Sequence, residues 1–178
     1  MRYNELTFQG RNAVLEAFRS GKTIDKLFIL DGCQDGPIKS IVREAKKTDA
    51  IINYVDKERL DRLAGTGHHQ GVVAIGAAYE YAEVEDILAA AKEKGEDPFI
   101  FILDEIEDPH NLGAIIRTAN LAGAHGVIIP KRRAVGLTAT VAKTSAGAIN
   151  YTPVAKVTNI SQTIEELKKQ GLWFVCAD

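Results

Sequence analysis

Residues 99–119 join an apolar strand to a helix through a polar turn, and this junction constrains the fold more than any other segment. The run at residues 99–103 is too short for a helix and rich in β-forming residues, so it predicts a strand covered on both faces. Covered strands are typical of parallel α/β sheets. Because such sheets bind ligands at the carboxyl ends of their strands, the turn after residue 103 is a candidate site.

The helix after this turn is expected to lie with one face on a sheet. We expect it to begin at Leu112 with Asn111 as its N-cap and to end near Gly123, because Pro109 keeps His110 out of the helix. The apolar stripe that would face the sheet consists of Leu112, Ile115, Ile116, Ala119 and Ala122. The rest of the helix surface is therefore available for polar groups.

Gly113, Arg117 and Asn120 fall together on the flank of this helix. A glycine one turn before an arginine leaves the guanidinium unobstructed, so its fork of donors can bind an anion or a ribose oxygen. The alternative is an ordinary solvated arginine, which is the commoner case for any single helix. Arg117 is therefore a candidate binding residue, and the rest of the sequence has to decide between the two interpretations.

Strands and helices alternate along the rest of the chain, which indicates an α/β protein. Further strands are expected at residues 27–30, 51–55, 72–76, 125–129, 150–155 and 172–176, and further helices at residues 13–18, 38–47, 57–64, 138–148 and 160–170. A polar turn, His68-His69-Gln70-Gly71, precedes the strand at residues 72–76. Adjacent histidines point in different directions, so this pair alone does not predict a metal site.

The charge distribution divides the chain into two parts. The protein has 178 residues, of which 46% are hydrophobic, and a formal net charge of −2. Residues 1–78 hold 12 basic and 10 acidic side chains, residues 79–98 hold 2 and 7, and residues 99–178 hold 8 and 7. The acidic stretch at residues 79–98 therefore predicts a connector between two small domains.

Several classes of protein are disfavoured. No apolar run reaches the length of a membrane span and the N-terminus lacks a secretory signal, so we expect a cytoplasmic protein without membrane contact. Cys33 and Cys176 have no CxxC spacing and no neighbouring metal ligands, which predicts free thiols and no metal. No glycine-rich phosphate loop follows any strand, which argues against a nucleotide-binding domain.

Four segments of the second half together resemble one protein family. Residues 111–119, Asn-Leu-Gly-Ala-Ile-Ile-Arg-Thr-Ala, look like the first motif of the SpoU/TrmH family of RNA ribose 2'-O-methyltransferases. Residues 126–130, 138–148 and 153–159 are similar to the branch of that family that acts on guanosine in large-subunit (23S) ribosomal RNA. The resemblance implies an enzyme that uses S-adenosylmethionine, acts on ribosomal RNA and forms a homodimer.

The resemblance also implies a domain plan. Residues 1–78 would form a small α/β RNA-recognition domain similar to certain ribosomal proteins, and residues 79–98 the connector. Residues 99–178 would form the first part of a parallel-sheet SPOUT-type methyltransferase domain. The later family motifs, which fold into a trefoil knot that binds S-adenosylmethionine, have no counterpart in the sequence. We therefore expect a domain truncated before the knot, with the cofactor-binding residues beyond Asp178.

Site residues follow from the matched motifs. Arg117 would polarise the ribose hydroxyl that attacks the methyl group, and Asn111 would orient the arginine or the ribose. The residues expected to contact RNA are Arg11, His68, His69, Gln70, Lys131, Arg132 and Arg133. For the triplet at residues 131–133 a solvated surface patch is an equal alternative. A second hypothesis for the whole chain is a non-catalytic RNA-binding protein, or a fragment, that has lost the cofactor site.

Overall fold

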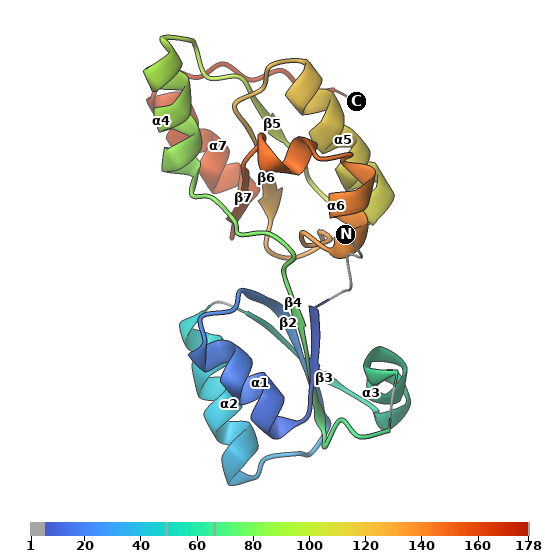
Figure 1. The fold of residues 1–178 in the computed structure, drawn as a ribbon. Helices are drawn as coiled ribbons and strands as arrows, with labels where there is room; N and C mark the ends of the chain where they lie inside the picture. The colour runs from blue at the N-terminus through green and yellow to red at the C-terminus, as the bar shows by residue number, and fades with distance from the viewer. Residues whose placement is uncertain (1–5, 49, 66, 178) are drawn as a thin grey trace. The chain divides into compact units, whose positions relative to one another are not determined.

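A computed structural model describes residues 6–48, 50–65 and 67–177, which fall into two compact units (Figure 1). Unit 1 contains the chain up to Glu80 together with Gly136–Ala139, and unit 2 contains Tyr81–Val135 and the residues from Thr140 onward. Both units combine helices with a sheet that contains parallel strands. The expected α/β class is therefore confirmed.

The sheet of unit 1 has the strand order β1-β4-β2-β3. Its strands are β1 (Leu6–Gln9), β2 (Ile24–Leu30), β3 (Ile51–Val55) and β4 (Val72–Gly76). β4 runs antiparallel to both of its neighbours, β1 and β2, whereas β2 and β3 are parallel. Parallel neighbours need a crossover connection, which the helix α2 (Gly36–Lys47) provides. Because β4 lies between β1 and β2, the turn before it leads directly into a central strand of this sheet.

Helices lie on both faces of the unit 1 sheet (Figure 1). α1 (Arg11–Arg19) and α2 cover one face, and α3 (Lys57–Ala64) covers the other. The core under α1 and α2 includes Val14, Leu27, Ile29, Ile38 and Ile41, and the core under α3 includes Phe28, Val55, Leu60 and Val73. Successive residues of β2 thus point to opposite faces, as strand geometry requires.

Unit 2 contains a parallel sheet in the order β5-β6-β7. Its strands are β5 (Ile100–Ile102), β6 (Gly126–Pro130) and β7 (Val154–Val157). Every residue of β6 is buried, whereas those of β5 are only partly buried. We expected the strand at residues 99–103 to be covered on both faces, and this was wrong, because β5 lies at the edge of this sheet and β6 in its middle.

Four longer helices accompany this sheet in the described part of unit 2, and a short one follows α6. They are α4 (Val84–Lys94), α5 (Pro109–Leu121), α6 (Ala139–Thr144) and α7 (Ile160–Lys169), with the 3₁₀ helix η1 (Ala148–Asn150). α4 and α7 share a core with β6 and β7, formed by Ile87, Ile128, Ala155 and Leu167, and α5 lies on the other side of the sheet (Figure 1).

The acidic stretch at residues 79–98 contains a helix that belongs to unit 2. α4 packs so closely on the sheet that a Cβ atom placed on Gly126 would lie 2.8 Å from Cγ1 of Ile87, which is fully buried. The division between the units falls between Glu80 and Tyr81. The segment that we expected to connect two domains is thus folded over most of its length.

The end of the described chain departs from the sequence expectation. Residues 172–176 were expected to form a strand, but they adopt no regular secondary structure. Leu172 and Phe174 pack partly buried against the core of α4 and α7, whereas Trp173 and Val175 are almost fully exposed. This alternation is strand-like, but the segment pairs with no strand among the described residues, so the expected strand does not form.

The small-residue segment at residues 138–148 is not one helix. α6 ends at Thr144, and Ala146 and Gly147 then adopt left-handed backbone conformations with φ of 50° and 88°. The turn of η1 follows, in which the Tyr151 amide donates to the Ala148 carbonyl at 2.9 Å. The strand expected at residues 150–155 is therefore displaced to Val154–Val157.

Within the described residues, no helix is long and apolar enough to span a bilayer.

Candidate functional site

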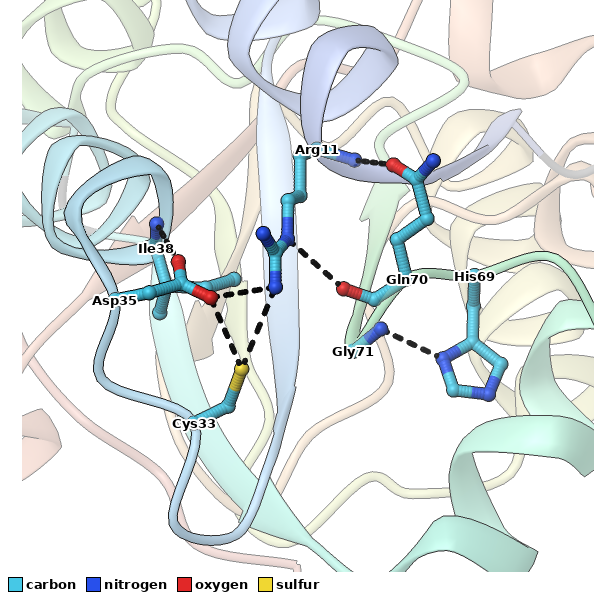
Figure 2. Close-up of polar contacts among 7 residues, drawn as sticks. All are labelled: Arg11, Cys33, Asp35, Ile38, His69, Gln70 and Gly71. Carbon is cyan, nitrogen blue, oxygen red and sulfur yellow. Dashed lines mark hydrogen bonds and ion pairs between the residues drawn. The ribbon is translucent and has the colours of Figure 1, made fainter.

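The polar turn of unit 1 holds the arginine at the start of α1 (Figure 2). The Arg11 backbone amide donates to Oε1 of Gln70 at 3.2 Å, and Nε of the Arg11 side chain donates to the Gln70 carbonyl, also at 3.2 Å. Nη2 of Arg11 contacts Oδ2 of Asp35 at 2.5 Å. The structure therefore brings together Arg11 and Gln70, which we expected to act at one surface, and adds Asp35.

Asp35 serves two elements at once. Its Oδ1 accepts from the Ile38 amide at 3.2 Å and caps α2, while its Oδ2 binds Arg11 (Figure 2). The Cys33 thiol lies 3.8 Å from both Nη2 of Arg11 and Oδ2 of Asp35. These contacts fix the guanidinium near the N-termini of α1 and α2, and the Asp35 carboxylate supplies the negative charge that a helix N-terminus favours.

An open cavity lies beside this turn. Its volume is about 460 Å³, and Arg11, Asn12, Pro37 and Gln70 line it. Gln70 has a φ of 51°, a left-handed conformation that few residues other than glycine adopt, and it turns its amide toward the amide of Arg11. Local backbone strain of this kind is common at binding sites. The cavity offers amide and guanidinium donors to a ligand.

The two histidines of the turn have different environments. His68 is exposed, whereas His69 is buried, with 5% of its surface accessible. Nδ1 of His69 accepts from the Gly71 amide at 3.0 Å, so Nε2 carries the hydrogen of the neutral ring and donates to Oδ1 of Asp61 at 2.9 Å. His69 therefore supports the turn from inside, rather than lying at the surface as an RNA contact would.

In unit 2, α5 begins earlier than the sequence suggested. Asp108 is its N-cap: Oδ1 of Asp108 accepts from the Asn111 amide at 2.8 Å, and Pro109 is the first helical residue. Our assignments of Asn111 as the cap and of Pro109 as a barrier were wrong. Proline is favoured at the first helical position, because no amide is needed there, and an aspartate before it is a good cap.

Loss of this cap should destabilise unit 2 measurably. Asp108→Ala removes the acceptor of the Asn111 amide, and we expect the free energy of unfolding to fall by about 1 kcal/mol. The matched control is Asn111→Ala, because the Asn111 side chain is exposed and makes no hydrogen bond with the described residues. Urea unfolding followed by circular dichroism measures both. A larger loss for the Asn111 variant would contradict the assignment of the cap.

Asn111 and Arg117 project from α5 without touching. The two residues are six positions apart on the helix. Their side chains therefore lie about 9 Å apart along the helix axis and about 120° apart around it. Both side chains are exposed, and that of Arg117 makes no hydrogen bond or ion pair with the described residues. The structure thus leaves the guanidinium free to bind a ligand, and it does not support direct orientation of Arg117 by Asn111.

Gly113 allows α6 to approach the first turns of α5. A Cβ atom on Gly113 would overlap Oγ1 of Thr144 and would lie 2.8 Å from its Cβ. That hydroxyl also donates toward the Thr140 carbonyl at 2.9 Å and the Pro109 carbonyl at 3.3 Å. The helix of Arg117 is therefore held at its start by two neighbours, the Asp108 cap and α6.

The basic triplet follows β6, at the same edge of the sheet as the loop before α5. Lys131 is partly buried, and its backbone amide donates to the Val157 carbonyl at 2.8 Å. Arg132 is exposed. Nη1 of Arg133 lies 2.6 Å from Oε1 of Glu105, so its charge is paired within unit 2. The triplet is not a uniform patch of solvated cations.

Sequence reasoning missed the acidic partners of these sites. Asp35 and Glu105 bind residues 24 and 28 positions away, and Asp61 binds a residue eight positions away in the next turn. Helix and strand periodicity predicts none of these pairs. Asp108 could have been found, because an aspartate before proline at a helix start is a recognised capping signal. In the described part of the chain, no group of three or more metal-ligating side chains could hold a metal ion.

Comparison with known proteins shows the family. Residues 9–82 match the model described as RNA 2'-O ribose methyltransferase substrate binding, and residues 98–178 match that of the SpoU rRNA methylase family. YacO of Bacillus subtilis, whose name places it among TrmH family tRNA/rRNA methyltransferases, is 54% identical over 95% of this chain and 68% of its own length.

Two further proteins are similar to the chain. A protein of Staphylococcus haemolyticus that is also named as a TrmH family tRNA/rRNA methyltransferase is 48% identical over 98% of this chain and 70% of its own length. The crystal structure of the SpoU methyltransferase AviRb from Streptomyces viridochromogenes in complex with AdoMet has a TM-score of 0.45, with 18% identity, over 94% of this chain and 59% of AviRb. From the identity to YacO and the two model matches, the chain belongs to the SpoU/TrmH family of RNA methyltransferases.

Proposed function

We propose that the protein transfers a methyl group from S-adenosylmethionine to the 2'-hydroxyl of a guanosine ribose in 23S ribosomal RNA. The family membership supports the reaction class, and the description of the first matched model supports the ribose hydroxyl as acceptor. The structural observation that carries the proposal is the exposed Arg117 guanidinium, unpaired among the described residues, on a helix whose start is anchored by Asp108 and Thr144.

Arg117 acts on the hydroxyl that attacks. As the oxygen of the ribose forms its bond to the methyl carbon, the bond between that carbon and the donor sulfur breaks, its electron pair stays on the sulfur, and the oxygen loses its proton. Negative charge develops on the oxygen during this step. The guanidinium donates hydrogen bonds to that oxygen and stabilises the charge. A guanidinium stays protonated near neutral pH, so Arg117 is an electrostatic stabiliser, and solvent or a phosphate takes the proton. Asn111, about 9 Å from Arg117 along the helix axis, is assigned to contact with the ribose rather than with the arginine.

The methyl donor supplies an electrophilic methyl group, and alignment with the ribose accounts for much of the barrier reduction. We assign no residue of this chain to the donor. The contribution of the described residues is to bind RNA and to hold Arg117 where the hydroxyl arrives. In this proposal the protein works as a cytoplasmic homodimer.

RNA recognition is assigned to unit 1 and to two residues of the basic triplet at residues 131–133. Arg11 and Gln70 present donors at the open cavity, and the exposed His68 belongs to the same turn as Gln70. His69 positions their turn from the core through Asp61 and Gly71. In unit 2, the exposed Arg132 contacts phosphates, and Lys131 adds charge from a partly buried position.

The test is methylation of defined RNAs. The protein is incubated with labelled S-adenosylmethionine and with transcripts of 23S ribosomal RNA, 16S ribosomal RNA or transfer RNA, and the modified nucleoside is identified by mass spectrometry. We expect 2'-O-methylguanosine in 23S RNA alone. Methylation of another transcript, or of another nucleoside, would contradict the assigned substrate while leaving the reaction class intact.

A second candidate is a non-catalytic RNA-binding protein. It is favoured by one observation: the donors at the open cavity of unit 1 and the exposed Arg117 and Arg132 can bind RNA without any methyl donor. Calorimetric titration with S-adenosylmethionine separates the two. Saturable binding supports the enzyme, whereas absence of binding together with tight RNA binding supports the second candidate.

A further inference from the structure

Two adjacent loops of unit 2 each contain a non-glycine residue in the left-handed backbone region. Glu105 lies in the loop after β5 with a φ of 53°, and Arg133 lies in the loop after β6 with a φ of 58°. Since β5 and β6 are parallel neighbours, both loops leave the same edge of the sheet. Such conformations are costly for residues with a Cβ atom and cluster at functional sites.

The two loops are joined by a side-chain contact and a backbone contact. Nη1 of Arg133 donates to Oε1 of Glu105 at 2.6 Å, and the Val135 amide donates to the Ile106 carbonyl at 2.8 Å. The paired side chains are 68% and 62% exposed, and exposed ion pairs contribute little to folding stability. The main effect of the pair is therefore to hold the two loops in position relative to each other, rather than to stabilise the fold.

The loop that holds Glu105 leads directly into α5. Asp108, the cap of α5, follows Glu105 by three residues, and Ile106 between them is tied to Val135. A shift of this loop would move the first turn of the helix that carries Arg117. Arg132, next to Arg133, is exposed and makes no ion pair with the described residues, so its charge is available to RNA.

We propose that Arg133 is a positioning residue, which clamps the loop at residues 104–108 to the loop at residues 131–135 through Glu105, while Arg132 makes the phosphate contact. The part concerning RNA rests on the proposed function. Arg132 and Arg133 thus have different roles, although they are adjacent residues of the same type. The clamp requires opposite charges at residues 105 and 133, but either residue can carry the positive charge. An RNA contact, in contrast, requires the positive charge at residue 133.

Three variants separate the tasks: Arg133→Gln, its matched neighbour Arg132→Gln, and the charge swap that combines Glu105→Arg with Arg133→Glu. The first readout is amide hydrogen exchange at Val135 and Leu112 by NMR. We expect about two- to fivefold faster exchange in Arg133→Gln, no change in Arg132→Gln, and recovery in the charge swap. Exchange is measured without RNA or methyl donor, so this result does not depend on the proposed function.

The second readout is RNA affinity as a function of salt. We expect Arg132→Gln to reduce the slope of log affinity against log salt by about 0.7 to 0.9, and Arg133→Gln to leave it unchanged. Where the protein methylates RNA, Arg133→Gln should lower kcat about tenfold without raising KM, and the charge swap should restore it. Unchanged exchange in Arg133→Gln, a reduced salt slope in Arg133→Gln, or a charge-swap protein with exchange as fast as that of Arg133→Gln would overturn the proposal. Failure of the wild-type protein to bind RNA would instead overturn the proposed function.

Discussion

Arg117→Ala is expected to lower the rate of methyl transfer by a factor of about 10² to 10³, the usual cost of removing a donor that stabilises a developing oxyanion. RNA affinity should change little, because Arg117 contributes one exposed charge and the other RNA contacts that we propose lie in unit 1 and at Arg132. Folding stability should not change, since the Arg117 side chain has no hydrogen bond or ion pair with the described residues. Single-turnover methylation at saturating RNA measures the effect.

Two controls make this result specific. Thr118→Ala changes the exposed neighbour of Arg117, whose hydroxyl only donates to the Ala114 carbonyl at 3.1 Å, and should retain full activity. Arg117→Lys keeps the charge but loses the planar fork of donors, so it should recover only part of the rate. If Arg117→Ala kept more than about half of the wild-type rate, electrostatic stabilisation by this residue would be excluded.

Gly113→Ala is expected to have the largest effect on stability. The added methyl group would overlap Oγ1 of Thr144 and lie 3.0 Å from the Ser145 amide nitrogen. The backbones of α5 and of residues 144–145 can relieve this overlap only by moving apart. Overpacking of this kind lowers the free energy of unfolding by about 1 to 3 kcal/mol. It should also reduce activity, because the displaced helix carries Arg117. Urea denaturation and methylation assays measure the two effects.

The matched control is Gly36→Ala, a glycine at the start of α2. A Cβ atom on Gly36 would meet nothing within 4 Å, so alanine there should be neutral or slightly stabilising. Thr144→Ala combined with Gly113→Ala removes the hydroxyl that collides and should recover part of the loss. A Gly113→Ala protein as stable as the wild type would show that the contact between α5 and α6 is loose.

Local patterns predicted most of the secondary structure, because helix and strand periodicity depends on neighbouring residues. The helix of unit 1 at residues 38–47 and the strand at residues 51–55 agree closely with α2 and β3. The stripe of α5 is confirmed in Leu112, Ile116 and Ala119, whereas Ala122 is exposed beyond the last helical residue. Which strand lies in the middle of the sheet depends on topology, so hydropathy alone could not show that β5 is an edge strand.

The candidate site was only partly predictable for the same reason. Motif spacing selected Arg11, Gln70, Asn111 and Arg117, which the structure leaves at or near the surface. It could not reveal that His69 is bonded to Asp61 inside unit 1, nor that Arg133 is paired with Glu105. Both pairs form between segments that meet only after folding, and each changes the role of a residue that the sequence marks as polar.

The position of the methyl group in the RNA product tests the central claim most directly. RNA methylated with a labelled donor is hydrolysed in alkali, which cleaves at every ribose with a free 2'-hydroxyl. If the protein modifies ribose, the label is found in alkali-resistant dinucleotides, and it disappears from them in the Arg117→Ala protein. Label recovered in mononucleotides would place the methyl group on a base and would contradict the assigned role of Arg117.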